Sequence, residues 1–277
     1  SFDHTDKLGP ELLDIAREKA GIIKSHKSQV TSHKPVVISA PQEKVVIDVI
    51  RKRCKQTGAR LYEENKDFFY EKTGDGFKIK GIFNEYPELK ISLLGKYQLI
   101  NAALAVGIIE ALHSCNIKVN INSIRRGLYS VVWPGRMQVI EKSPFFIVDG
   151  AQNRASAKAL KESLKDFSFD SLILLLGISA NKDIAGITQE LCPQARQVIL
   201  TKANNPRAAQ PEIFEKIVKK YCRNTKLTGS TEEGLITARQ AASKDDLILA
   251  TGSFYLVGEI LKTQIHLRGV FGFCEGI

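Results

Sequence analysis

Two side chains near the start of the chain have types and positions that could support chemistry. Lys19 falls on the apolar stripe of a predicted helix over residues 10–24, among Leu12, Ile15, Ala16, Ala20 and Ile23. A lysine on a buried face costs free energy unless it is paired or chemically altered. Otherwise its stem carries the ammonium to solvent from the edge of the stripe. His4 precedes this helix in a polar loop and is either a structural histidine or a ligand.

Four more polar side chains occupy positions where a ligand could bind. Asp149 ends a predicted strand, where a carboxylate could accept hydrogen bonds from a ribose, hold a metal-bound nucleotide or cap the next helix. Arg136 follows a Trp-Pro-Gly break, and its planar fork could bind phosphate oxygens in pairs or lie on the surface. Ser253 could cap a helix or bind a substrate, and Asn101 could be a polar edge position or a ligand contact.

The second half of the chain alternates apolar strands with helices. Strands are predicted at 145–150, 172–177, 198–201 and 247–252, and helices at 155–165, 184–191, 211–221, 232–242 and 253–262. This order predicts a doubly wound α/β domain, whose ligands bind beyond the carboxyl ends of the strands. Asp149, Gly177 and Ser253 fall at such ends.

The first half is also predicted to be α/β. A strand at 35–40, a helix at 42–56 and a strand at 61–62 form a β-α-β unit. The remaining predictions are a hairpin of 68–72 and 77–81, a third strand near 89–93, and helices over 95–115 and 119–130. The Pro-Gly break after Trp133 predicts a boundary between domains 1–132 and 133–277.

Four stretches, in order along the chain, resemble the folylpolyglutamate synthase/dihydrofolate synthase family of Mur-type ATP-dependent amide ligases. They are DHTDKLG…IAREKAGIIK (3–24), GKYQLINAALA (95–105), WPGRMQ…DGAQN (133–153) and LILATGSFYLVG (247–258). The resemblance implies that 1–132 is the remainder of a central ATPase domain. It implies that 133–277 is a C-terminal, Rossmann-like glutamate-ligase domain.

The resemblance also implies roles for these residues. His4 matches a metal ligand of the family, and Lys19 matches a lysine that is carbamylated and helps to hold magnesium and phosphate. Asn101 matches an asparagine that contacts adenine, although Tyr97 replaces the more usual histidine before it. Arg136 matches an arginine that touches the ATP phosphates across the interdomain cleft.

Three further positions follow the family's last two motifs. Asp149 matches a carboxylate that contacts ATP, and Ser253 lies in a motif at the glutamate-binding end of the domain. Gln152 stands where the family has a histidine near the substrate. Because glutamine cannot exchange a proton near neutral pH, only hydrogen bonding survives at that position.

The implied reaction uses ATP and Mg²⁺ as cofactors and a folate and L-glutamate as substrates. ATP phosphorylates the terminal carboxylate of the folate, and the amino group of glutamate attacks the acyl phosphate. No GxxxxGK(S/T) loop occurs in these residues, although the family carries a phosphate loop before the first resembling stretch. The expectation is an N-terminally truncated ligase with little turnover alone. The alternative is a non-catalytic remnant that binds a nucleotide or a partner.

Composition and charge narrow the expected binding partners and the expected location of the protein. The net charge of +10 comes from basic residues that are spread along the chain without interleaved aromatics, so nucleic acid is not an expected partner. No apolar run of about 20 residues is evident, and neither a membrane nor a secretory signal is predicted. Five widely spaced cysteines favour reduced thiols and a cytoplasmic location. The oligomeric state does not follow from the sequence.

Overall fold

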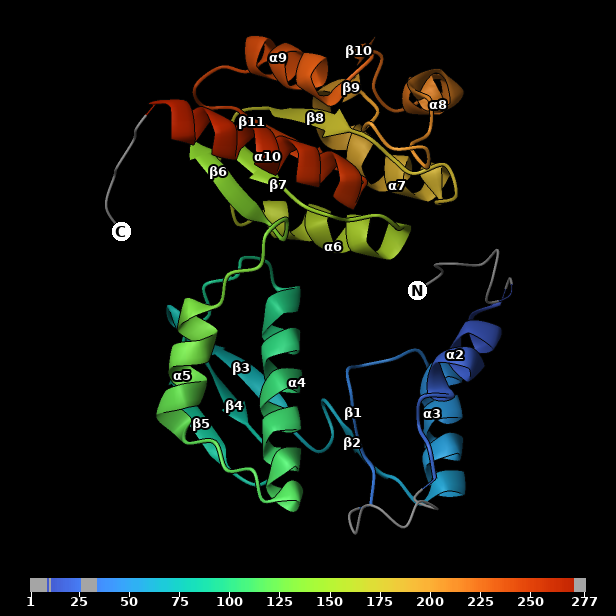
Figure 1. Ribbon diagram of the computed structural model, residues 1–277, viewed down its shortest axis with the longest axis vertical. Helices are drawn as coiled ribbons and strands as arrows, with labels where there is room; N and C mark the ends of the chain where they lie inside the picture. Colours follow the sequence, from blue (N-terminus) through green and yellow to red (C-terminus); the bar gives the residue numbers. More distant parts are fainter. Residues whose placement is uncertain (1–8, 10, 26–33, 272–277) are drawn as a thin grey trace. The chain divides into compact units, whose positions relative to one another are not determined.

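The computed structural model describes residue 9, residues 11–25 and residues 34–271, with side chains as far as residue 263. The chain divides into two compact units, one ending at Val132 and the other starting at Trp133 (Figure 1). The N-terminal unit contains two sheets and the C-terminal unit contains one, each unit has its own core, and each is described by itself.

The N-terminal unit starts from a β-α-β arrangement. Strands β1 (Val36–Ser39) and β2 (Arg60–Glu63) are parallel and are joined by helix α3 (Lys44–Thr57). Gly58 ends α3 in the left-handed region, with φ of 71°, a conformation that glycine adopts readily. Helix α2 (Leu12–Ala20) packs against α3. It is shorter than predicted because Gly21 and Ile22 form a turn directly after it.

An antiparallel sheet and two helices complete this unit. The predicted hairpin is confirmed as β3 (Phe69–Thr73) and β4 (Gly76–Lys80), whereas the third strand, β5 (Glu85–Leu89), comes earlier than predicted. Helix α4 (Tyr97–Ala111) contacts both β1 and β3, and α5 (Ile121–Ser130) contacts β5. The short 3-10 helix η1 (Leu112–Cys115) follows α4.

A buried carboxylate ties α4 to the β4–β5 turn. Glu110 has no exposed surface and accepts hydrogen bonds from the backbone of Ile82 (2.5 Å) and Asn84 (2.9 Å) and from the Tyr86 hydroxyl (3.1 Å). Burial and the neighbouring carboxylate raise the pKa of Tyr86 to about 12. The carboxylate therefore fixes the turn through donors that no local sequence pattern predicts.

Helix α4 also corrects the expectation that the chain has no apolar run of about 20 residues. The span Tyr97–Cys115 is long and apolar enough to cross a membrane by length and composition. The same helix carries buried Glu110 and packs its small residues Ala102 and Ala103 into the core of the unit. Core helices of globular units pass the same test, so the span is weak evidence for a membrane.

The C-terminal unit is a six-stranded sheet in the order β10-β9-β8-β11-β7-β6. Five strands are parallel and β6 is antiparallel to β7, which confirms the predicted doubly wound α/β class. The strands are β6 (Gln138–Lys142), β7 (Phe145–Val148), β8 (Leu172–Leu176), β9 (Ala195–Leu200), β10 (Thr225–Leu227) and β11 (Leu247–Thr251).

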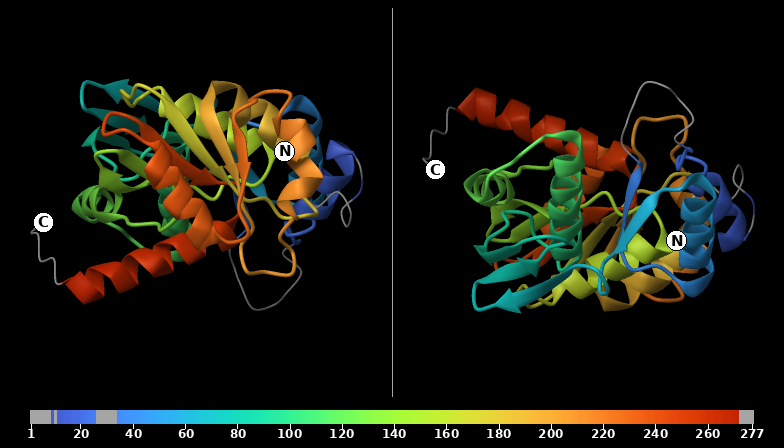
Figure 2. Two further views of the ribbon diagram at one scale, coloured as in Figure 1. Left: turned by 90° about the horizontal axis from the view of Figure 1, so that it is seen from above. Right: turned by 90° about the horizontal axis from the view of Figure 1, so that it is seen from below.

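Helices cover both faces of this sheet (Figure 2). Helices α9 (Thr231–Ala241) and α10 (Phe254–Phe271) pack against the central strands. Helices α6 (Arg154–Leu164), α7 (Ile184–Leu191) and α8 (Pro211–Val218) lie side by side, and η2 (Cys192–Gln194) follows α7. The sequence prediction missed β6 and β10, the two edge strands, because edge strands bury too few side chains to show a clear apolar pattern.

Candidate functional site

Three adjacent parallel strands bring polar and glycine positions to one edge of the C-terminal sheet. Strand β11 pairs with β7 on one side and with β8 on the other. Asp149 directly follows β7, and Gly177 directly follows β8. Ser253 comes after the short turn that follows β11. All three residues therefore lie at the carboxyl edge of the sheet, as the sequence predicted. This edge is where doubly wound folds bind their ligands.

Asp149 fastens a turn to this edge. Its Oδ2 accepts from the backbone N–H of Met137 at 2.9 Å, and its Oδ1 accepts from that of Ala151 at 2.8 Å. The residue is only 3% exposed, and the Gly150 N–H donates to the Gly135 carbonyl at 2.8 Å. Met137 has a φ of 43°, an uncommon value outside glycine, so this carboxylate helps to hold a strained turn.

The turn carries Arg136, whose guanidinium stacks on an aromatic ring. The Arg136 Cζ lies 4.7 Å from the centroid of Phe254, in the first turn of α10. A Cβ on Gly150 would lie 2.1 Å from Phe254, so only glycine lets the ring sit there. Stacking fixes the plane of the guanidinium. The N–H groups at the rim of that plane can still donate to a phosphate or a carboxylate.

Two helices begin at the same edge. The Ser253 hydroxyl accepts from the Tyr255 N–H at 3.0 Å and is buried, so it caps α10. Asn153 caps α6 by accepting from the Ser156 N–H at 2.9 Å, and Gln152 before it is half-buried. Helix N-termini favour anions because their first N–H groups lack intrahelical partners.

The predicted site residues of the N-terminal unit are placed differently. Lys19 is exposed, so the expectation of an inward position is wrong. Helix α2 ends one residue later, at Ala20, so no further helical turn follows to cover the lysine. Its stem can therefore extend into solvent. Asn101 is exposed on α4 and donates to the Gln98 amide oxygen at 2.8 Å. His4 lies outside the described residues.

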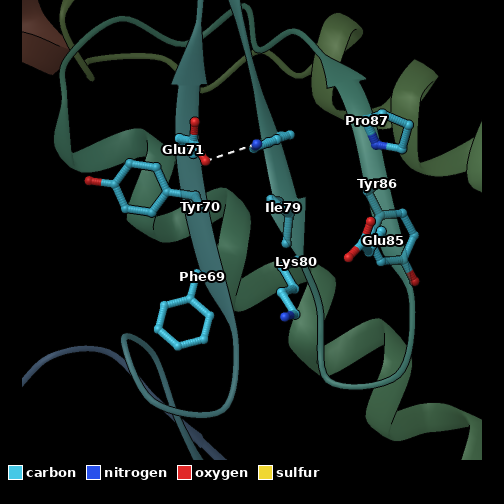
Figure 3. Close-up of a pocket in the computed structure, with 9 residues that line it drawn as sticks. Phe69, Tyr70, Glu71, Ile79, Lys80, Glu85, Tyr86 and Pro87 are labelled. Carbon is cyan, nitrogen blue, oxygen red and sulfur yellow. Dashed lines mark ion pairs between the residues drawn. The ribbon is translucent and has the colours of Figure 1, made fainter.

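A hollow separate from the residues above lies on the three-stranded sheet of the N-terminal unit (Figure 3). It has a volume of about 480 Å³, and the Lys78–Glu71 ion pair of 2.9 Å crosses it between β4 and β3. Phe69, 38% exposed, is its main accessible aromatic side chain. None of the residues predicted to do chemistry lines this hollow.

Comparison with known proteins decides the family. The family profile described as Mur ligase, glutamate ligase domain, matches residues 135–254. The dihydrofolate synthase/folylpolyglutamate synthase of Mycobacterium tuberculosis is 30% identical over 222 residues, covering 77% of this chain and 45% of that protein. The protein of the same name from Escherichia coli is 28% identical over 264 residues, covering 95% of this chain and 58% of its own length.

The fold agrees over the whole chain. The structure of Mycobacterium tuberculosis folylpolyglutamate synthase complexed with ADP matches with a TM-score of 0.84 and 26% identity, covering 100% of this chain and 62% of that one. The chain belongs to the folylpolyglutamate synthase/dihydrofolate synthase family of Mur-type ligases. It spans about half the length of the curated relatives named above.

No group of three or more His, Cys, Asp or Glu side chains that could hold a metal ion occurs in residues 11–25 and 34–263. Lys19 is exposed, and His4, its predicted companion, is not described. The assignment of His4 and Lys19 as metal ligands therefore stays a prediction.

Two features of the family's motifs were not predicted from the sequence. Phe254, next to Ser253, provides the ring on which Arg136 stacks. An aromatic residue directly after the Thr-Gly-Ser motif was the available signal, but its partner lies more than a hundred residues away. Thr251 is fully buried, and its hydroxyl has no hydrogen-bond partner among the described residues. A threonine at the end of a strand gives no sign of this.

Proposed function

We propose that this chain is part of an ATP-dependent ligase that joins L-glutamate to a folate through an acyl phosphate. The relatives it matches are named dihydrofolate synthase/folylpolyglutamate synthase, and the Mycobacterium tuberculosis structure contains ADP. The proposal extends the folate, glutamate and nucleotide chemistry in these names to this chain.

The observation that carries the proposal is the Arg136 turn at the carboxyl edge of the sheet. Asp149 locks the turn from below with two hydrogen bonds, and Phe254 supports the guanidinium from one side. A cation whose orientation is fixed before the ligand arrives stabilises phosphate charge without reorganising during transfer. Asp149 is a positioning residue in this arrangement, since its carboxylate oxygens accept from the protein backbone.

The proposal gives the other predicted residues limited roles. Arg136 contacts ATP phosphates, Asn101 contacts adenine, and Ser253 at the N-terminus of α10 orients glutamate. Gln152 donates or accepts hydrogen bonds near the substrate and moves no proton near neutral pH. Lys19, carbamylated, and His4 remain the predicted magnesium ligands.

A second candidate is a non-catalytic chain of the same fold that binds a nucleotide or a partner. The exposed position of Lys19 and the glutamine at 152 favour it. It predicts ADP binding without folate- and glutamate-dependent ADP release. The ligase proposal predicts that such release occurs, and that it is slow for this chain alone.

The test pairs turnover with binding. ADP release is measured with and without a folate and L-glutamate, and binding is measured with a fluorescent ADP analogue. Arg136→Met should weaken ADP binding about 10-fold, because it removes a charge-assisted contact of roughly 1.5 kcal/mol. Arg223→Met, at an exposed arginine of the same unit, is the matched control. If the unsubstituted chain and the Arg136→Met variant bind ADP with equal affinity, the proposed phosphate contact of Arg136 is refuted.

A further inference from the structure

The turn that carries Arg136 is also closed by a side chain, that of Gln138. This glutamine is the first residue of β6, and its Oε1 accepts from the Gly135 N–H at 2.9 Å. The amide oxygen therefore joins the end of the turn to its start. Gly135 is buried, and a buried N–H that loses its acceptor destabilises the folded chain. The turn thus depends on the Gln138 side chain as well as on Asp149.

The backbone of this turn needs such contacts to keep its conformation. Arg136 lies between two residues with left-handed backbones, Gly135 with φ of 73° and Met137 with φ of 43°. Glycine adopts this region readily, whereas methionine occupies it at a cost in free energy. The surrounding structure must therefore hold the turn, because its own sequence does not favour it.

Each of the other contacts fixes a different part of the turn. The Gly135 carbonyl accepts from the Gly150 N–H at 2.8 Å, and the Met137 N–H donates to Asp149 at 2.9 Å. On the side of α10, a Cβ at Gly135 would lie 2.8 Å from Cγ1 of Val257, so the helix packs closely against the turn. Among the described residues, the Gly135 N–H, which enters the turn just before Arg136, has Gln138 as its acceptor.

The conformation of the turn decides where the Arg136 guanidinium lies. Its Cζ is 4.7 Å from the centroid of the Phe254 ring, and this stack fixes the plane of the group. The position of the guanidinium along that ring follows from the direction of the Arg136 side chain as it leaves the backbone, which the turn sets. A guanidinium binds a phosphate with least reorganisation when its position is fixed before the ligand arrives.

We propose that Gln138 is a positioning residue for Arg136. Its amide oxygen holds the Gly135 N–H, and the turn then keeps the guanidinium stacked on Phe254 in the absence of a ligand. The gain in ADP affinity that follows rests on the proposed function, whereas the ordering of the guanidinium does not. The competing explanation is that Gln138 supports only the start of β6 and does not influence Arg136.

The first test measures the order of the Arg136 side chain without any ligand. The whole chain is labelled with ¹⁵N, and relaxation of the Arg136 Nε–H is followed, its signal being identified by its loss in Arg136→Met. Its order parameter should be about 0.85 in the unsubstituted chain and below about 0.6 in Gln138→Met, which has a similar length and no acceptor oxygen. An unchanged order parameter in Gln138→Met would overturn the proposal.

Two further variants separate the hydrogen bond from a general loss of structure. Gln138→Glu keeps an acceptor oxygen of the same reach and should keep the guanidinium ordered. Gln240→Met replaces an exposed glutamine on α9 and should leave the Arg136 signal as it is. A disordered guanidinium in Gln138→Glu, with the amide signals of β8 and β11 unchanged, would show that the acceptor oxygen is not what holds it, and would contradict the proposal.

The second test is a double-mutant cycle on the affinity for a fluorescent ADP analogue. Gln138→Met should weaken binding about fivefold, the effect of one net hydrogen bond. In the Arg136→Met background the same substitution should change nothing, because Gln138 acts through Arg136. A fivefold loss in both backgrounds would mean that the two residues act independently, and the proposal would fail. If the unsubstituted chain binds no ADP, the proposed function fails, while the order parameter of Arg136 still decides the role of Gln138.

Discussion

Replacing Asp149 by asparagine tests whether this carboxylate holds the Arg136 turn. The carboxylate accepts from the Met137 and Ala151 N–H groups at 2.9 and 2.8 Å in a site that is 3% exposed. Asparagine keeps one acceptor oxygen, but its NH₂ group then faces a buried N–H. Hydrogen bonds to charged groups contribute about 1.5–3 kcal/mol each. Losing one and weakening the other should cost about 3 kcal/mol.

Hydrogen–deuterium exchange of the whole chain measures this loss locally, peptide by peptide, so the two units are separated. A cost of about 3 kcal/mol corresponds to a roughly 100-fold loss of protection, since each 1.4 kcal/mol is about tenfold. The loss should be centred on peptides covering 135–151. Asp170→Asn, at an exposed aspartate of the same unit, should leave exchange unchanged. A loss below about threefold in Asp149→Asn would refute the reasoning.

Two further predictions concern buried carboxylates of the N-terminal unit. Glu110→Gln should lower the stability of the β4–β5 turn by about 3 kcal/mol, because one carboxylate oxygen becomes an NH₂ group that faces either the Ile82 or the Asn84 N–H, and exchange protection there reports it; a cost below about 1 kcal/mol would contradict the assignment. Glu64 is buried with no partner for either oxygen among the described residues, and burial raises its pKa. Because its pKa is raised in the folded state, this carboxyl holds its proton more tightly there than in the unfolded state. The free energy of unfolding therefore falls as the pH rises above the ordinary carboxyl pKa. Glu64→Gln should therefore raise Tm at about pH 8 and match the parent near pH 4; equal Tm values at both would refute it.

The sequence by itself determined the class of fold and the location of the ligand edge. Apolar runs such as 172–177 and 247–252, separated by helical patterns, can be satisfied only by a parallel sheet covered on both faces. Residues at the carboxyl ends of such strands share one edge, so the strand pattern alone is enough to place Asp149 and Ser253 there. The motifs around them were also sufficient to indicate the family.

Only the tertiary structure decided what each side chain does. An ideal helix puts Lys19 on the buried stripe, but burial depends on whether another element covers that turn, and none of the described elements does. The Arg136–Phe254 stack and the Glu110 contacts join residues far apart in sequence. Local patterns carry no information on such pairs, because the pairing is set by how strands and helices pack.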